Sequence, residues 1–503
     1  MIAGASRHRP LRPLIVGLGL CLVLFCLYFV IREPHDAVTW EQKSQQDQNR
    51  QNKDRHKQTP HRPSSATLQS LSLTEKQCQA EFPGLTRSID EIVAEGPFRL
   101  KNTGDMGALQ GRIKNGKIFI INAQQRSDLS EQMVNSRTAA IHQLHRALIT
   151  APASEPLPDT YFSINFQDQP FGTSWGYSRA INPAFRSKDR DERNFLMPHF
   201  SFWAWKLPFI GSIGRAAAAI DRLEHELYPV FYHKIPRAVW RGTTWFNSVH
   251  SPRLRQNLVA VAKGQSWADV EALDWVGGGG TGGRVQSSAQ NATNALAIED
   301  FCRYRYVLHT EGVAYSGRFQ FLQMCNSVTI TPPIVWMQHT THLVKPVFSS
   351  HLLGAATTKP NSAKEKESPR KEAHKFAHDV KSVGKKISRR SLSVSNTAKT
   401  SSGHKSWPVS YPAGEANIVF VAPDWSDLKD TVAWLEAHPE VAAGIARNQR
   451  DLFVGGGYFS PAAETCYWRA LVRGWATVAK IDRKEWIGHE EVSYESFTLD
   501  NGN

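Results

Sequence analysis

The sequence has few cysteines and few long uncharged stretches, and both shortages exclude classes of protein. The 503-residue chain contains six cysteines and no Cys-x-x-Cys pair, so the spacing of a zinc site is missing. After residue 31, no segment combines the length and the apolar character that a membrane span needs. The glycine-rich stretch 277–283 is followed by neither a Lys-Ser/Thr pair nor a helix signal, which excludes a P-loop and predicts a mobile loop.

One long uncharged stretch does lie near the N-terminus. Leu14–Ile31 runs for about the thickness of a hydrocarbon core, and Arg7, Arg9 and Arg12 precede it. This positive excess predicts that residues 1–13 stay in the cytoplasm as a short tail. A cleaved signal peptide is the alternative, but its apolar region is usually about 7–15 residues and ends at small residues. We therefore expect a single-pass type II membrane protein with a lumenal body.

Two polar segments are too poor in apolar residues to fold by themselves. Residues 32–77 are predicted to form a disordered stem, because their Gln-, Asn- and Lys-rich sequence cannot offset the entropy of ordering. Residues 359–405 hold thirteen Lys and Arg against four Asp and Glu, which is +9 of the net charge of +14. A solvated, disordered insertion is favoured there over a functional polybasic patch. Nucleic acid is not an expected partner, because the body is expected to be lumenal.

Tail, span, stem and body together are the layout of enzymes resident in Golgi or other secretory-pathway membranes. Within the body, Cys78, Cys302, Cys325 and Cys466 allow two disulfides, whereas Cys21 and Cys26 lie in the span. Asn291 begins an Asn-Ala-Thr glycosylation sequon, which is usable in that compartment.

The remaining body, roughly 350 residues, is enough for two α/β domains. Strands are predicted at Thr160–Phe166, Arg303–Thr310 and Ser327–Thr331, with a helical stretch at Arg318–Met324 between the last two. That order is a β-α-β unit of a parallel sheet. Near the C-terminus, Ser426 is expected to cap one helix and Ser460-Pro461 to begin another, with both helices packed on a sheet.

Three short segments could carry chemistry, although each has a plainer reading. Gly312–Arg318 follows a strand and could hold a diphosphate, but on its own it predicts a turn with a surface arginine. Arg241, after Val239 and Trp240, could bind the same group together with Arg255, or could simply be a packed side chain. Asp168 follows the first strand and could act as a general base, although an Asp near a Pro is usually a turn residue.

Asp189-Arg-Asp191 matches the Asp-x-Asp pattern by which some sugar transferases bind a divalent metal. It lies in a charged run with no apolar strand beside it, so a solvated loop is the better interpretation. No metal cofactor is expected.

Taken in order, these pieces resemble glycosyltransferase family 90, the group of capsule-associated proteins and lumenal protein O-glucosyl- and O-xylosyltransferases. The similar stretches include LPDTYFSINFQDQP from Leu157, NFLMPHFSFWAWKLP from Asn194, KIPRAVWRGTTW from Lys234 and VFVAPDWSDLKDTVAWL from Val419. The most specific is CRYRYVLHTEGVAYSGRFQFLQMCNSVTI from Cys302.

The resemblance implies a GT-B fold, in which two Rossmann-like domains face a cleft. We expect residues 78–235 to form an acceptor-side domain, residues 236–358 and 406–485 a UDP-sugar-binding domain, and residues 486–503 a C-terminal tail. The implied disulfides are Cys302–Cys325 and Cys78–Cys466. The implied general base is Asp168, and the UDP-binding groups map to Arg241, Gly242, Thr243, Arg255, Val313, Ala314, Tyr315, Ser316, Gly317 and Arg318.

The resemblance thus predicts a metal-independent, inverting transferase that moves a sugar from a UDP-sugar to a hydroxyl of a glycan or glycoprotein. Xylose is slightly preferred over glucose, through the capsule-associated branch. The alternative is a membrane-tethered protein that kept the fold and binds glycans or nucleotide sugars without turnover. A glycosidase is disfavoured, because no second carboxylate is placed as a partner to Asp168. This chain departs from the family pattern at Ile334-Val335-Trp336, where relatives often have an acidic residue before the Trp, and at the basic insertion.

Overall fold

The structure is a computed structural model, and it describes residues 62–104, 107–182, 192–248, 250–276, 292–354 and 409–500. Several predictions lie outside these ranges: the tail, the membrane anchor, the first part of the stem, Asp189, Asp191, the glycine-rich stretch, Asn291 and the basic insertion. Within the ranges, none of the helices combines the length and the apolar character that a membrane crossing requires.

Six parallel strands form the sheet of what we call the second lobe, in the order β13-β14-β11-β10-β8-β9. Chain order reverses at β8, because β9 lies on one side of it and β10 on the other. The carboxyl ends of β8 and β10 therefore enclose a topological switch point, where open α/β sheets bind ligands. The strands are β8 Ile235–Gly242, β9 Ala268–Ala272, β10 Tyr304–Leu308, β11 Val328–Thr331, β13 Pro346–Phe348 and β14 Ile418–Phe420.

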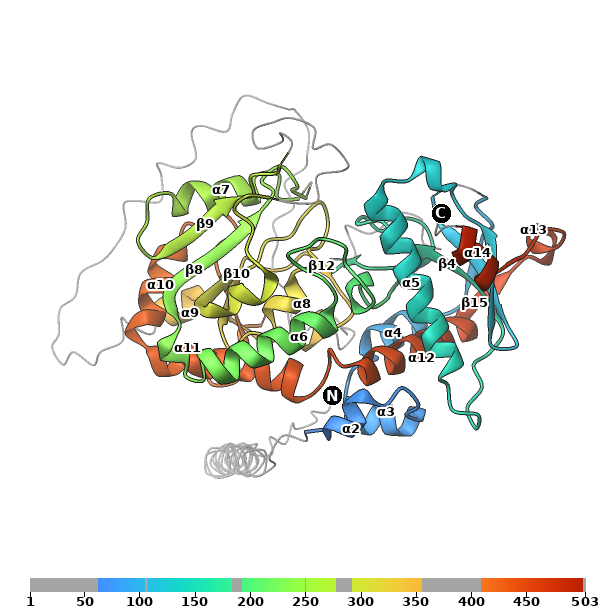
Figure 1. Cartoon of the computed structure of the whole chain (residues 1–503), viewed down its shortest axis with the longest axis horizontal. Coiled ribbons are helices and arrows are strands. Elements are labelled where there is room, and N and C mark those ends of the chain that lie inside the picture. Colours follow the sequence, from blue (N-terminus) through green and yellow to red (C-terminus); the bar gives the residue numbers. More distant parts are fainter. Residues whose placement is uncertain are drawn as a thin grey trace, which may run out of the picture. The chain divides into compact units, whose positions relative to one another are not determined.

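Helices cover both faces of this sheet, which explains why its strands are apolar runs. In β8, Val239 packs into the core on one face, whereas Trp240 packs into the core on the other. Helices α7 (Leu254–Ala262), α10 (Leu428–Ala437) and α11 (Pro439–Arg450) contribute to the core on the Trp240 face. Helices α6 (Ile213–Arg222) and α8 (Phe319–Leu322) contribute to the Val239 face. Figure 1 shows α7 beside β9 and β8.

The parallel β-α-β unit is confirmed, because β10 and β11 pair in parallel and α8 connects them. The predicted cap of α10 is wrong by one residue, since Asp427 occupies the N-cap position. The Ser426 hydroxyl donates instead to the Asp424 carboxylate at 2.7 Å, which holds it in the preceding turn.

The first lobe contains a mixed sheet in the order β16-β3-β2-β4-β5-β7. The pairs β16–β3, β3–β2 and β2–β4 are antiparallel, whereas the pairs β4–β5 and β5–β7 are parallel. The fold class is therefore α/β, but this sheet is only partly parallel, unlike the sheet of a Rossmann domain. The strands are β16 Val492–Ser493, β3 Lys117–Asn122, β2 Leu109–Lys114, β4 Thr160–Asn165, β5 Ser174–Gly176 and β7 Asn194–Leu196.

Two long helices pack together in the first lobe, α5 (Glu131–Ile149) and α12 (Pro461–Val478). Ser460 caps α12 as predicted, because its hydroxyl accepts from the Ala463 amide at 3.1 Å. The side chains of α12 reach the mixed sheet, where the ring centres of Trp475 and of Trp175 in β5 lie 5.5 Å apart. The chain thus returns to the first lobe at α12, whereas the predicted UDP-sugar-binding domain extended to residue 485. The last segment also folds here, since β16 pairs with β3 and α14 (Tyr494–Asp500) follows it.

A small antiparallel ribbon joins the lobes. Strand β6 (Arg179–Ala180) follows β5 of the first lobe, and β12 (Trp336–Met337) follows β11 of the second lobe. Trp336 pairs with Ala180, and Met337 pairs with Arg179. One core cluster also runs through both lobes.

Both disulfides implied by the resemblance are present. Cys302–Cys325 connects the two ends of the β10–α8 segment, and Cys78–Cys466 ties the N-terminal helices to α12.

The stem prediction is wrong from residue 62 onward, where the chain is folded. Helices α2 (Ser65–Gln69), α3 (Glu75–Glu81) and α4 (Arg87–Val93) lie against α12. A capping box at Thr74 supports α3, and the buried Arg469 guanidinium donates to the carbonyls of Leu71 and Leu73. Local caps and one buried arginine thus order a segment whose composition suggested disorder.

Candidate active site

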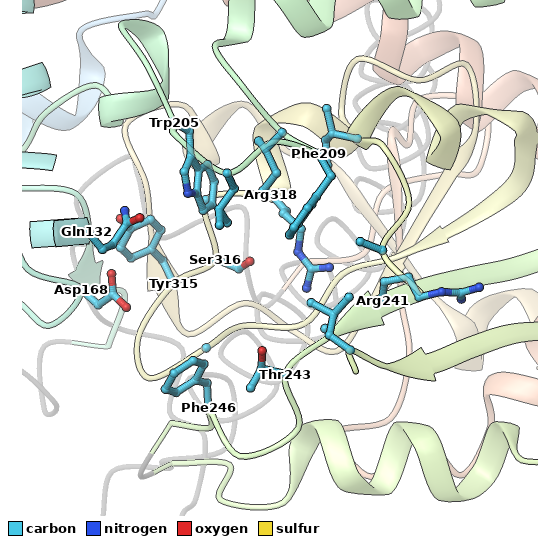
Figure 2. Close-up of a pocket in the computed structure, with 18 of the residues that line it drawn as sticks. Gln132, Asp168, Trp205, Phe209, Arg241, Thr243, Phe246, Tyr315, Ser316 and Arg318 are labelled. Atoms are coloured by element: carbon cyan, nitrogen blue, oxygen red, sulfur yellow. The ribbon is translucent and has the colours of Figure 1, made fainter. Parts of the chain in front are cut away.

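A cavity of about 370 Å³ opens at the switch point between β8 and β10, with first-lobe residues on its other side. It brings together ten of the predicted site residues: Asp168, Arg241, Gly242, Thr243, Arg255, Val313, Tyr315, Ser316, Gly317 and Arg318. Ala314 is fully buried and is not part of the lining. Figure 2 shows Ser316 between Asp168 and Arg318 in this view.

Arg255 contributes a buried and rigidly held positive charge. Its Nε donates to the carbonyl of Glu311 at 2.9 Å, and its Nη1 donates to the carbonyl of Thr243 at 2.8 Å. Burial, together with the nearby Arg318, lowers its pKa to about 9, although Asp168 opposes this fall. The guanidinium therefore stays charged at neutral pH, and main-chain oxygens fix its orientation.

Arg318 contributes a second positive charge. Its guanidinium lies 5.8 Å from the centre of the Trp240 ring, and burial lowers its pKa to about 10. In the part of the chain that the structure describes, Arg318 forms no salt bridge. Arg255 and Arg318 face one cavity, and neither forms a salt bridge in the described part of the chain, so together they form a site for an anion such as a diphosphate.

Asp168 lies at the first-lobe side of the same cavity, just beyond β4. Its main chain is held by the Ser178 hydroxyl, which donates to the Asp168 carbonyl at 3.1 Å. Asp168 is exposed where it faces the cavity. The protein around the cavity partly desolvates its carboxylate and so raises its pKa, while Arg255 lowers it. A carboxylate with a raised pKa in a cleft is suited to accept a proton.

The loop Gly312–Arg318 packs tightly against the first lobe. A Cβ on Gly317 would lie 2.5 Å from Nε2 of His199 and 2.9 Å from the Trp205 ring, so only glycine fits there. His199 is buried, and its Nδ1 accepts from the Ser201 amide at 3.2 Å, which leaves the proton on Nε2. The helix that follows, α8, has only one turn. The arginines rather than a helix dipole must therefore provide most of the positive potential.

Arg241 has a different environment from the one predicted. Its Nη2 donates to the Asp269 carboxylate at 2.7 Å, and its Nε and Nη1 donate to the carbonyls of Asn294, Trp240 and Asp269. Glu271 lies 3.5 Å from Nε. Figure 2 shows the guanidinium pointing away from Arg318 and Asp168. Arg241 therefore braces β8 against β9, and a role in UDP binding stays a prediction.

Sequence reasoning missed the apolar end of the cavity. This end is lined by Leu207, Phe209, Ile210, Leu273, Trp275, Leu296, Ile298 and Phe301. Trp275 is oriented by its Nε1, which donates to the Thr243 hydroxyl at 3.1 Å. Gln132 and Phe246 were also missed, and both line the cavity. The only available signal was the aromatic sequence FSFWAWKLPF from Phe200, whose spacing fits an ordinary core equally well.

No cluster of three or more possible metal ligands occurs among the residues that the structure describes. Asp189 and Asp191 lie outside those residues, so the structure does not bear on their role.

Comparison with known proteins decides the family. The model of "Glycosyl transferase family 90" matches residues 101–394, more than half of the chain. The chain belongs to glycosyl transferase family 90. The matched region of this family-90 protein contains Asp168, the three arginines that line the cavity and the Cys302–Cys325 disulfide.

Two curated proteins are similar to part of this chain. The chain is 26% identical over 201 residues to the O-glucosyltransferase rumi of Drosophila melanogaster, and 28% identical over 201 residues to the protein of that name from Drosophila pseudoobscura pseudoobscura. Each match covers 39% of this family-90 chain and 47% of the relative. The chain thus spans about half the length of the curated relatives that it matches.

Proposed function

We propose that this protein is a metal-independent, inverting glycosyltransferase of GT-B type that moves a sugar from a UDP-sugar to a hydroxyl of a glycan or glycoprotein. The observation that supports the proposal most strongly is that Asp168 faces the same cavity as Arg255 and Arg318. A nucleotide binder needs the arginines, but it has no use for a carboxylate of raised pKa beside them. Family membership and the two named relatives support the same reaction class.

The chemistry follows from the order of the groups along the cavity. The apolar end accommodates the base of the nucleotide, and Arg255 and Arg318 bind the diphosphate. Asp168 accepts the proton of the acceptor hydroxyl as its oxygen attacks the anomeric carbon from the face opposite the diphosphate. The bond from that carbon to the diphosphate breaks, and the two guanidinium groups stabilise the negative charge of the departing UDP. The arginines thus supply the positive charge that a divalent metal supplies in other transferases.

The proposed donor is UDP-glucose or UDP-xylose. The names of the relatives favour glucose, and the resemblance to capsule-associated proteins favours xylose. The proposed location is the lumen of the secretory pathway, with an N-terminal anchor at residues 14–31. Two disulfides support an oxidising compartment.

The test is UDP release by the purified body with a panel of UDP-sugars, with and without a chelator. We expect release with at least one sugar, no effect of the chelator, and inverted configuration in the product. Asp168→Asn should keep UDP affinity and lose about 10²–10⁴-fold in turnover. Release that depends on metal would overturn the metal-independent mechanism, and full activity of Asp168→Asn would remove the general base. A protein that binds UDP but releases none from any sugar would be the non-catalytic alternative.

A further inference from the structure

Glu311 is a buried acidic residue that the mechanism above does not use. It lies three residues after the end of β10, it is 6% exposed, and it does not line the cavity. Its Oε1 accepts from the main-chain amide of Val335 at 2.9 Å and from that of Trp336 at 2.7 Å. In the part of the chain that the structure describes, no cation forms a salt bridge with it. Both of these hydrogen bonds reach the segment that enters β12.

The segment held by Glu311 is the part of the second lobe that pairs with the first. Trp336 pairs with Ala180, and the amide of Ile181 donates to the carbonyl of Val335 at 2.9 Å. Two residues before Ala180, Ser178 donates its hydroxyl to the main chain of Asp168. The Glu311 carboxylate is therefore connected to the main chain of the general base through one short ribbon.

The main chain of Glu311 is connected to the other half of the site. Its carbonyl accepts from Arg255 Nε at 2.9 Å. The Trp336 indole, on the segment that the carboxylate holds, donates to the Ser248 hydroxyl at 3.2 Å, in the loop between β8 and Arg255. Glu311 thus contacts Arg255 directly, and it reaches Asp168 of the other lobe indirectly, through the ribbon.

We infer that Glu311 is a positioning residue, whose carboxylate holds the Val335–Trp336 segment and so fixes Asp168 at the correct distance from Arg255 and Arg318. This inference rests on the proposed function. It explains why an acidic side chain without a cationic partner is kept in the interior, where a polar group is costly. Burial raises the pKa of Glu311 to about 8, although the two main-chain amides oppose this rise. Because a misplacement of about 1 Å can reduce turnover about 10²-fold, loss of this contact should affect catalysis more than binding.

The test compares Glu311→Ala and Glu311→Gln with a matched control, Glu464→Ala. The amide oxygen of Gln can accept both main-chain hydrogen bonds, whereas Ala cannot. Glu464 is also buried, at 2% exposed, but it pairs with Arg146 between α12 and α5 and is not part of the cavity lining. UDP-binding stoichiometry from calorimetry normalises the activity of each variant to its folded fraction.

We expect Glu311→Ala to lose about tenfold or more in kcat per UDP-binding molecule, with the Kd for UDP changed less than about threefold. Glu311→Gln should stay within about threefold of the parent, and Glu464→Ala should keep its normalised kcat. A normalised kcat of Glu311→Ala equal to that of the parent or of Glu464→Ala overturns the inference.

Hydrogen–deuterium exchange provides a second readout that does not depend on activity. Glu311→Ala should accelerate exchange at residues 335–337 and, through the ribbon, at residues 178–181. Unchanged exchange at residues 178–181 overturns the inference even if turnover falls. If the parent protein transfers no sugar, the proposed function fails, and the exchange experiment still decides whether Glu311 holds the two lobes in register.

Discussion

Asp168 and Arg255 lie close enough for each charge to shift the pKa of the other. Partial desolvation raises the pKa of Asp168, and Arg255 opposes this rise. Burial lowers the pKa of Arg255, and Asp168 opposes that fall. Asp168 belongs to the first lobe and Arg255 to the second, so the packing of the two lobes creates this interaction. It gives the site a pH dependence that can be measured.

The first prediction concerns the acid limb of the pH profile of kcat/KM, which reports groups of the free enzyme. The base acts when it is ionised, so activity should fall as the pH falls through the pKa of Asp168. Because Arg255 lowers that pKa, Arg255→Gln should move the acid limb to higher pH. Arg255→Lys, which keeps the charge, should move it less. A limb at the same pH in all three proteins would contradict an electrostatic link between the two residues.

The second prediction separates Arg318 from Arg241, two of the three arginines that line the cavity and that the sequence assigned to the same role. Arg318→Met removes a positive charge that has no salt-bridge partner in the described part of the chain. It should weaken UDP binding by about 30-fold or more, because truncating a charged binding partner costs about 2–5 kcal/mol. Stability without ligand should stay constant or rise, since an uncompensated charge has left a low-dielectric site.

Arg241→Met should show the opposite pattern. It leaves the Asp269 carboxylate, 15% exposed, without its closest cation, so the free energy of unfolding should fall by about 1–3 kcal/mol. The affinity for UDP, normalised to folded protein, should change much less than in Arg318→Met. Urea unfolding and calorimetric titration with UDP measure both quantities. A large loss of affinity in Arg241→Met without loss of stability would restore Arg241 as a direct ligand.

These two arginines show what the sequence could and could not reveal. A motif places Arg241 and Arg318 at the ends of neighbouring strands, and both do lie at the cavity. The position of a motif does not reveal which guanidinium is already paired within the protein. The partners of Arg241, Asp269 and Glu271, lie in β9, whose sequence carries no motif. The parallel unit, the disulfides and Asp168 followed from local pattern and family resemblance. The apolar wall and the ribbon between the lobes could not be predicted, because they arise from long-range pairing such as that of Trp336 with Ala180.

The third prediction concerns stability in acid, which follows from a group of buried histidines. Burial lowers the pKa of His309 and of His339 to about 3 and that of His342 to about 4, and it lowers the pKa of His199 well below the usual value. These side chains are neutral in the folded protein, whereas they take up protons near pH 6.5 in the unfolded chain. The stability that they contribute is therefore present above about pH 6.5 and is lost as the pH falls below it.

Two buried glutamates act in the opposite direction over part of this range. Burial raises the pKa of Glu311 to about 8 and that of Glu464 to about 7, so in the folded protein they hold protons that the unfolded chain has already lost. Their contribution decreases as the pH rises above about 4.5. Four histidines outweigh two glutamates between about pH 4.5 and 6, so we expect the free energy of unfolding to fall as the pH is lowered through that window.

The measurement is urea unfolding at a series of pH values between 7 and 5, with His309→Gln and, as the control, the exposed His351→Gln. His309→Gln removes one group that binds a proton only when unfolded, so the slope of stability against pH should decrease by up to about 1.4 kcal/mol per pH unit. His351→Gln should leave the slope unchanged. The ring centres of His309 and Phe319 lie 4.4 Å apart, so His309→Gln could also weaken packing. That cost does not depend on pH, and comparing the slopes therefore cancels it. Equal slopes in the parent and in His309→Gln would show that this histidine binds its proton equally well in the folded and the unfolded protein, which would contradict the prediction.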